Sequence, residues 1–389
     1  MRACFFLHAL DRAEFAFLMD KAREIRCADD VAQVIAAHFR RIGDRDDDRT
    51  PRTAFVEALI FLRFFIERGL GHPAEVEFVH ARNFLILNDT VQEADGRGFK
   101  PLEGPVVFAT SRDSWRHAFF QFLAEYFHDR VFLVKPNPDI PDFGRDKLGS
   151  LGRIWALRSE LVGDVVIPFM RNRHVEQVRQ LLEFVRDNIG AKVVLKASQG
   201  VEGQKVRALD LSGRDDCLER VASAVKADFL DDTASGTPSL YFTKYYEIET
   251  EFRIYYTRDH SGEVTVFSVK NRENQPKDGS SAFAKKDFTT RSFTVTWHYM
   301  APETFRSEHP EVQAAFVQVV ALLDAEVGVV EMCRERDGSV RFIELNPLGG
   351  ALMHQGKDED LMTQYMLRMW EIAAFRDVND GVTAEVKIN

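Results

Sequence analysis

Several patterns by which proteins are readily classified are missing from this sequence. The 389 residues contain only four cysteines, which are scattered and form no CxxC pair: Cys4, Cys27, Cys217 and Cys333. Neither a zinc site nor a disulfide framework is therefore expected, and a reducing, cytoplasmic setting fits best. No stretch approaches the roughly 20 apolar residues that span a bilayer. The short apolar run near the start is interrupted at Asp11, too early for a signal peptide.

An excess of basic residues is also lacking. The formal net charge is −10, which argues against nucleic acid or an anionic membrane as the main partner. Tyrosine is scarce, with 8 residues against 32 phenylalanines, which indicates large apolar cores. With 45% hydrophobic and 29% charged residues, the chain has the composition of a globular protein large enough for two or three domains.

The familiar phosphate-binding motifs are absent as well. The chain contains no Walker sequence GxxxxGK[ST] and neither HRD nor DFG, so it is not a P-loop protein or a typical protein kinase. There is no internal repeat, and no Ser-His-Asp or Cys-His arrangement stands out. Whatever chemistry the chain carries must rest on other side chains.

Hydrophobic periodicity divides the chain into four segments. Residues 1–98 carry helical periodicity, as in the runs 12–42 and 52–68, and are predicted to form a helical N-terminal region. Residues 99–185 alternate short β-branched runs with helical segments, which predicts an α/β domain. Residues 191–209 and 239–272 follow as two blocks rich in strands. A helix is expected between them and the C-terminal hairpin, from about 310 to 326.

The C-terminal hairpin carries the first candidate site. "DG" at 337–338 predicts a tight turn that brings Glu331 close to Glu344. Glu344 and Asn346 lie two apart on a strand and so point to one face. Two carboxylates and an amide oxygen are hard ligands suited to Mg²⁺ with a nucleotide. An exposed polar hairpin is the alternative, and Glu335, Arg336 and Arg341 are interpreted as solvated.

A lysine and a glycine loop form the second candidate site. Lys196 ends the apolar strand "VVLK" and is followed by "ASQGVEGQ", with Gly200 and Gly203. Such a loop can bring backbone N–H groups to phosphates. An ordinary hairpin turn remains the alternative for this stretch taken alone.

The order of these motifs resembles the ATP-grasp superfamily over roughly residues 145–375. The order is lysine strand, glycine loop, strand, "FTKYYE", "ExR" strand, basic strand, acid strand and "ExN" strand. The resemblance implies an α+β fold in which two lobes, 186–246 and 247–389, hold ATP. It also implies a pre-grasp α/β domain at 99–185, preceded by the helical region 1–98.

The resemblance also implies a set of site residues. Those for ATP are Lys147, Lys196, Gly200, Gly203, Lys244, Tyr245, Tyr246 and Glu251, with the backbone of 243–246 reading adenine and Glu251 binding ribose. Those for phosphoryl transfer are Arg253, Lys270 and Arg272, and those for Mg²⁺ are Glu331, Glu344 and Asn346. Arg153 is expected to lie behind Lys147.

The sequence differs from the pattern of the family at two positions that bear on the implied activity. Glu331 stands where the family more often has Asp, and its carboxylate is chemically equivalent. Val329 stands where D-alanine ligase-like members carry Arg, which argues against D-alanine as substrate. Short stretches also resemble tubulin tyrosine ligase-like proteins and a cell-division-cycle family of assembly factors.

The implied function is an ADP-forming ligase. It would use ATP and Mg²⁺ to join a small-molecule or peptide carboxylate to an amine through an acylphosphate. A kinase on the same scaffold and a non-enzymatic ATP-binding assembly factor are the alternatives. The substrates and the oligomeric state stay open, although homodimers are frequent among such ligases.

Overall fold

The computed structural model of the chain forms two compact units. Unit 1 comprises Met1–Pro141, Tyr256–Phe267 and Leu348–Asn389, and unit 2 comprises Asp142–Tyr255 and Ser268–Pro347. The structure describes residues 2–7, 12–42, 49–80, 84–87, 90–93, 106–110, 131–133, 147–166, 174–197, 206–213, 215–227, 240–273, 298–346, 364–365, 367–368 and 370–372. No helix in these ranges has the length and apolar character to cross a membrane.

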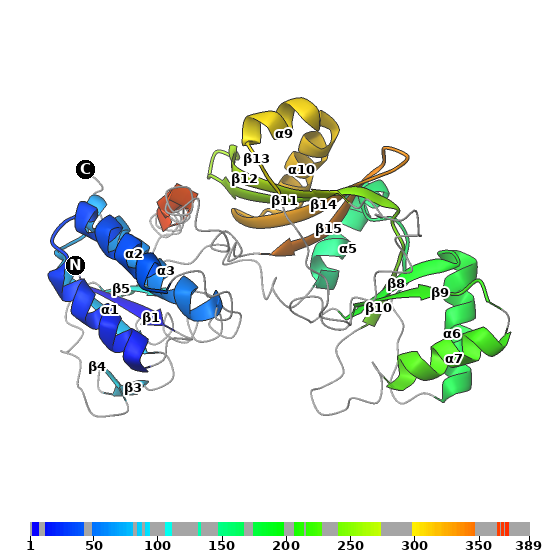
Figure 1. The fold of residues 1–389 in the computed structure, drawn as a ribbon, viewed down its shortest axis with the longest axis horizontal. Helices are drawn as coiled ribbons and strands as arrows, with labels where there is room; N and C mark the ends of the chain where they lie inside the picture. Colours follow the sequence, from blue (N-terminus) through cyan, green and yellow to red (C-terminus); the bar gives the residue numbers. More distant parts are fainter. Residues whose placement is uncertain are drawn as a thin grey trace. The chain divides into compact units, whose positions relative to one another are not determined.

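Unit 1 is built on a parallel sheet with the strand order β2-β1-β5-β6. Its strands are β1 (Arg2–Leu7), β2 (Val76–His80), β5 (Val106–Thr110) and β6 (Val131–Leu133), and β3 (Phe84–Leu87) and β4 (Thr90–Glu93) form a separate hairpin. Its helices are α1 (Arg12–Glu24), α2 (Ala28–Ile42), α3 (Arg49–Glu67) and the 3₁₀ turn η1 (Pro73–Glu75). α1, α2 and α3 lie beside β1 and are drawn in blue in Figure 1.

Aromatic rings fill the core of unit 1, as the abundance of phenylalanine predicts. The ring of Phe5 on β1 lies 4.9 Å from that of Phe61 on α3 and 6.1 Å from that of Phe78 on β2. Trp370 packs edge-on against Phe61 at 5.3 Å. The C-terminal segment therefore belongs to the core of the N-terminal sheet.

The helices expected within 12–42 and 52–68 are present as α1, α2 and α3, but the region 1–98 is not purely helical as predicted, because it also supplies strands. β1 and β2 come from it, and β1 pairs with β5 from the predicted pre-grasp segment. The predicted boundary at 98/99 thus separates strands of one sheet. The six-residue run of β1 pairs only with strands far along the chain, so local periodicity does not reveal it.

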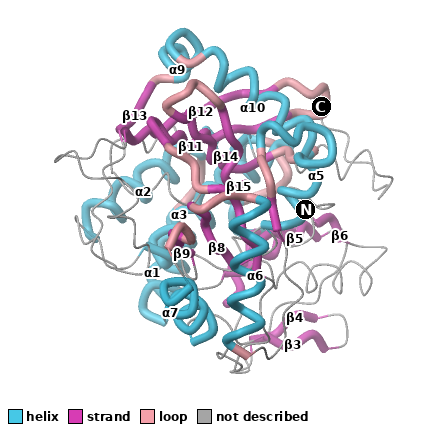
Figure 2. Tube along the Cα trace, turned by 90° about the vertical axis from the view of Figure 1, so that its right-hand side faces the viewer, coloured by secondary structure: helices cyan, strands magenta, loops and turns pink. Residues whose placement is uncertain are grey.

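The first sheet of unit 2 has the order β7-β10-β8-β9. Its strands are β7 (Val165–Val166), β8 (Lys192–Ala197), β9 (Val206–Asp210) and β10 (Leu240–Lys244). Two helices, α6 (Val175–Asn188) and α7 (Asp215–Val225), cover one face (Figure 1) and run close to one another (Figure 2). Apolar side chains from helices and strands, such as Leu182, Leu195 and Phe242, form the core between them.

The second sheet, most of whose residues belong to unit 2, has the order β13-β12-β11-β14-β15. Its strands are β11 (Ile248–Arg258), β12 (Val264–Glu273), β13 (His298–Met300), β14 (Val327–Glu335) and β15 (Val340–Asn346). Helices α9 (Pro302–Glu308) and α10 (Pro310–Leu323) lie over one face of this sheet (Figure 1), where Phe252 packs on Phe305 at 5.6 Å. The opposite face carries the polar residues described below.

A short helical segment precedes both sheets of unit 2. It comprises α5 (Lys147–Arg158) and the 3₁₀ turn η2 (Ser159–Leu161), and both pieces pack against β15. The two sheets separate between Lys244, where β10 ends, and Ile248, where β11 begins. The lobe boundary at 246/247 falls in this link and stays a prediction.

Candidate functional site

The β14–β15 hairpin aligns two carboxylates on one face of its sheet. Its turn is the predicted one: Gly338 has a φ of 87°, and the Asp337 carboxylate accepts a hydrogen bond from the Ser339 N–H at 2.9 Å. Glu331 then pairs directly with Glu344, which confirms the expected proximity. Residues that pair directly across strands share a face, so both carboxylates project to the same side.

A β-bulge turns Glu344 onto that face. Met332 pairs with Phe342 while Glu331 pairs with Glu344, so Ile343 is the extra residue. Phe342 is buried on the helix-covered side with Met332. Without the extra residue, the alternation of the strand would place Glu344 on that apolar side too.

Asn346 completes a cluster of three polar side chains, which we call the acidic cluster: Glu331, Glu344 and Asn346. The Asn346 amide donates hydrogen bonds to Glu331 Oε1 and to Glu344 Oε1, both at 3.2 Å. One amide thus lies between two carboxylates, and rotation of that amide would turn its oxygen toward the same point. The predicted metal ligands are therefore brought together.

Each carboxylate of the acidic cluster has a cation beside it. Arg253 Nε on β11 lies 2.7 Å from Glu331 Oε1. Lys147 Nζ, at the start of α5, forms an ion pair with Glu344 Oε2. Both cations were predicted for the site. Together they neutralise two carboxylates that would otherwise repel each other in a site shielded from water.

Lys196 links the first sheet to the acidic cluster. Burial lowers the pKa of Lys196 below its ordinary value of 10.5, and the nearby charge of Lys147 lowers it too, whereas Glu344 and Glu251 raise it. Burial pushes the pKa of Glu344 up, but Lys147 and Lys196 outweigh burial and hold that pKa below its usual value. The end of β8 therefore lies within electrostatic reach of the second sheet.

Further predicted residues extend the same polar face across neighbouring strands. Glu251 and Arg253 alternate with apolar residues on β11, and Glu251 is buried. On β12, Lys270 is buried with its ammonium 5.4 Å from the ring of Tyr255 and 4.9 Å from that of Tyr299. The neighbouring strands β12, β11 and β14 thus carry Lys270, Arg253 and Glu331, and the last two form an ion pair.

The link between β10 and β11 is partly used by the fold itself. The Tyr245 N–H donates to the Lys192 carbonyl at 3.1 Å, so this one N–H group of the segment 243–246 is engaged inside the protein. The Glu247 N–H donates to Glu335 Oε2 at 3.3 Å. The Tyr246 N–H and carbonyl lie between these anchors, with no hydrogen bond to a residue that the structure describes.

Some predicted residues are not part of the described site. Gly200 and Gly203 lie outside the described residues, and Arg272 is described only as part of the backbone of β12. Arg153, expected behind Lys147, lies on the same helix α5 and donates to the Leu323 carbonyl at 3.0 Å at the end of α10. Its role is therefore to cap a helix.

The sequence reasoning missed a group of residues at the other end of the hairpin. Glu335 and Arg341 were interpreted as solvated, but Glu335 is buried and lies 2.7 Å from Arg341 Nε. Cys333 is buried on the same strand, and burial raises the pKa of its thiol far above the usual range. Strand alternation from Glu331 through Cys333 to Glu335 is the signal that predicts this shared face.

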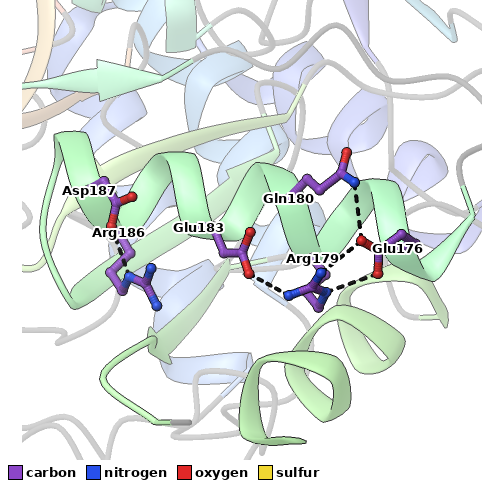
Figure 3. A network of polar contacts seen from close by, with 6 residues as sticks. All are labelled: Glu176, Arg179, Gln180, Glu183, Arg186 and Asp187. Carbon is purple, nitrogen blue, oxygen red and sulfur yellow. Dashed lines mark hydrogen bonds and ion pairs between the residues drawn. The ribbon is translucent and has the colours of Figure 1, made fainter. Parts of the chain in front are cut away.

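Burial distinguishes these pairs from ordinary surface pairs. On α6, Arg179 lies 2.8 Å from Glu176 and 2.5 Å from Glu183, each one helical turn away (Figure 3). The Glu176 side chain is 57% exposed, whereas that of Glu331 is 6% exposed. Water screens the ion pairs on α6, whose role is to stabilise that helix. The charges of the buried acidic cluster are screened much less.

The donor set of the acidic cluster fits a hard divalent cation that keeps some ligands from elsewhere. No group of three His, Cys, Asp or Glu side chains within the described ranges is arranged to hold a metal ion. Two carboxylates and one amide supply fewer oxygen ligands than a protein site for Ca²⁺ normally provides. They suit Mg²⁺, which binds few protein ligands together with water and phosphate.

Comparison with known proteins gives information at the level of the fold. No family model and no curated protein matches the chain. The solved structure of D-alanyl-alanine synthetase A from Vibrio cholerae O1 superposes with a TM-score of 0.52 at 9% identity, over 95% of this chain and 98% of that one. D-alanine–D-alanine ligase from Coxiella burnetii gives 0.50 at 13% identity, over 76% of each chain.

A biotin carboxylase from Campylobacter jejuni is also similar, with a TM-score of 0.43 at 14% identity over 69% of this chain. The chain spans about half of that enzyme's length, 54%. Identities this low inform on architecture alone. The chain has the ATP-grasp fold.

Proposed function

We propose that this protein is an ATP-dependent ligase that activates a carboxylate as an acylphosphate and joins it to an amine, releasing ADP and phosphate. The observation that carries the proposal is the acidic cluster, in which Glu331 and Glu344 face the same point with Asn346 between them. Lys196 lies within electrostatic reach of this cluster from the opposite sheet. Cations and paired acids in this arrangement suit a magnesium nucleotide.

The side chains divide the work by position. Glu331, Glu344 and Asn346 would hold Mg²⁺, which when bound neutralises phosphate charge. Lys196 and Lys147 would bind the phosphates of ATP, together with the loop that contains Gly200 and Gly203. Tyr246 would meet the base through its backbone, and Glu251 would meet the ribose. Lys244 and Tyr245 would flank the base.

Arg253 and Lys270 would act on the group being transferred. In the first step a substrate carboxylate oxygen attacks the γ-phosphorus, the bond to the bridging oxygen breaks, and ADP leaves. In the second step an amine attacks the acyl carbon, phosphate leaves, and the amine loses a proton. Positioned cations stabilise the negative charge on the phosphoryl oxygens, so no covalent intermediate with the protein is required. Arg272 would assist from the same strand.

The substrates belong to the same proposal. Both similar ligases are named for D-alanine. Val329 replaces the arginine that the resemblance associates with such members, so we propose a different carboxylate and amine. Both are expected to be small molecules or peptides.

Product analysis tests the proposal. Purified protein is incubated with MgATP and pools of candidate acids and amines, and nucleotide and phosphate are quantified. ADP and phosphate that form only when both an acid and an amine are present support the ligase. AMP and pyrophosphate would contradict it. ADP with a stable phosphorylated product and no need for amine would indicate a kinase, and tight ATP binding without turnover would indicate an assembly factor.

A further inference from the structure

A second polar group, separate from the acidic cluster, surrounds Arg341 at the far end of β15. Arg341 Nε donates to Glu335 Oε1 at 2.7 Å, and another guanidinium nitrogen donates to the Glu160 carbonyl in η2. The guanidinium carbon lies 5.8 Å from the centroid of the Tyr246 ring, within range of a cation–π contact. Arg341 therefore contacts three different elements of unit 2.

Glu335 connects this group to the backbone of the link between the two sheets. Its second oxygen, Oε2, accepts from the Glu247 N–H at 3.3 Å. The Arg336 N–H donates to the Glu247 carbonyl at 3.1 Å, so Glu247 is held on both sides. Because Glu335 is only 7% exposed, its charge requires Arg341 as a partner.

Tyr246 is fixed from its side chain while its backbone is left open. Its hydroxyl donates to the Val162 carbonyl, and burial raises the pKa of that hydroxyl far above the usual range, so it remains a donor. Gly163 next to it has a φ of 69°, and a Cβ at that position would lie 3.6 Å from the Tyr246 hydroxyl. That distance would be an ordinary contact, so it is the positive φ of the turn after η2 that favours glycine here.

These contacts converge on one peptide unit. Tyr245 and Glu247 are anchored through their N–H groups, and the Tyr246 ring is anchored by Val162 and Arg341. Such a backbone can offer a donor and an acceptor to a flat heterocycle in a fixed position. Each anchor is a side chain or a carbonyl that holds the link without occupying the Tyr246 amide.

We propose that Arg341 and Glu335 are positioning residues that hold the Tyr246 backbone in place for the base of a bound nucleotide. This inference rests on the proposed function, since it assumes that a nucleotide binds between the sheets of unit 2. It assigns Arg341 to the base end of the nucleotide and Lys147 and Lys196 to the phosphate end. Binding at the phosphate end can be measured by itself with a ligand that has phosphates but no base.

The experiment compares the affinities of MgATP and magnesium tripolyphosphate by calorimetry for the full-length wild type, Arg341→Gln and Arg341→Lys. The matched control is Arg334→Gln. Arg334 lies on β14, next to Glu335 in sequence, but it pairs with Glu249 at 2.9 Å and Glu311 at 3.3 Å, away from the Arg341 group. Melting temperatures of all four proteins show whether each is folded.

Arg341→Gln is expected to weaken MgATP binding at least about tenfold, because misplacing a positioned group by about 1 Å can cost as much as roughly 100-fold. Tripolyphosphate affinity should stay within about twofold of wild type, and Arg341→Lys should restore part of the MgATP affinity. Arg334→Gln should change neither affinity. In steady-state turnover, Arg341→Gln should raise the KM for ATP and leave kcat unchanged.

Equal loss of both ligands in Arg341→Gln, or MgATP binding equal to wild type, would overturn the inference while leaving the proposed function in place. Should wild type bind MgATP no better than tripolyphosphate, the base end is not read and the inference also fails. Should wild type bind neither ligand, the proposed function itself fails. If Arg341→Gln is not folded, Tyr246→Phe replaces it, with the same comparison of ligands.

Discussion

Lys147 and Glu344 form an ion pair between the first residue of α5 and the second carboxylate of the acidic cluster. The two side chains are 16% and 19% exposed, so the pair is largely shielded from water. Glu344 is also a proposed metal ligand, and Lys147 is a proposed phosphate ligand. In this ion pair each side chain satisfies the other, so under the proposed function a magnesium nucleotide would exchange these partners.

The first prediction follows from that exchange. Lys147→Met should increase the affinity for a divalent cation alone by roughly tenfold, because the ammonium no longer competes for Glu344. The same variant should bind nucleotide more weakly, because a phosphate contact is lost. Titration with Mn²⁺ in the absence and presence of ADP measures both effects. Changes of the same sign for both ligands would show that Lys147 does not exchange partners.

The second prediction concerns Arg153, which caps α10 through the Leu323 carbonyl. Arg153→Ala should lower the free energy of unfolding by about 1 kcal/mol or less, because one partly exposed hydrogen bond is lost. Denaturant unfolding measures this change. The KM for ATP should be unaffected, and a raised KM would return Arg153 to the phosphate site.

The third prediction concerns pH. Lysine is charged below its pKa, and burial lowers the pKa of Lys196 below 10.5. MgATP affinity should therefore fall as pH rises through that lowered pKa, at a lower pH than an exposed lysine would give. Binding measured from about pH 7 to about pH 10 tests this expectation, and Lys196→Arg should be flat because arginine stays charged.

Stability provides an independent check of the same shift. Between the lowered pKa of folded Lys196 and its unfolded value near 10.5, the unfolded chain binds more protons than the folded one. The free energy of unfolding should therefore rise with pH in this window. The rise should be smaller in Lys196→Arg, and an identical slope in both proteins would contradict the assignment.

The acidic cluster could be predicted largely from local sequence. "DG" fixes the turn of the hairpin, and the spacing of Glu344 and Asn346 fixes their common face. The bulge at Ile343 was not predicted, because the consecutive apolar residues Phe342 and Ile343 interrupt the alternation of this seven-residue strand without specifying a bulge. The order of motifs along the chain led to the ATP-grasp fold before any one motif was decisive.

Long-range contacts account for what the sequence did not reveal. Arg341 was interpreted as solvated because its partner, the Glu160 carbonyl, lies 181 residues away. Arg153 was expected behind Lys147, and its partner at the end of a distant helix, the Leu323 carbonyl, could not be foreseen for the same reason. β1 was missed because a parallel strand is recognised by its neighbours, which lie far along the chain.

Glu344→Gln, compared with Glu249→Gln, tests the central claim most directly. Glu249 is an exposed acid on β11 that pairs with Arg334, so it controls for the loss of a carboxylate. Divalent-dependent binding of ADP, measured by calorimetry with and without Mg²⁺, should fall by about 100-fold in Glu344→Gln and stay unchanged in Glu249→Gln. Magnesium-dependent binding equal to wild type in a folded Glu344→Gln protein would contradict the claim that this carboxylate holds the metal.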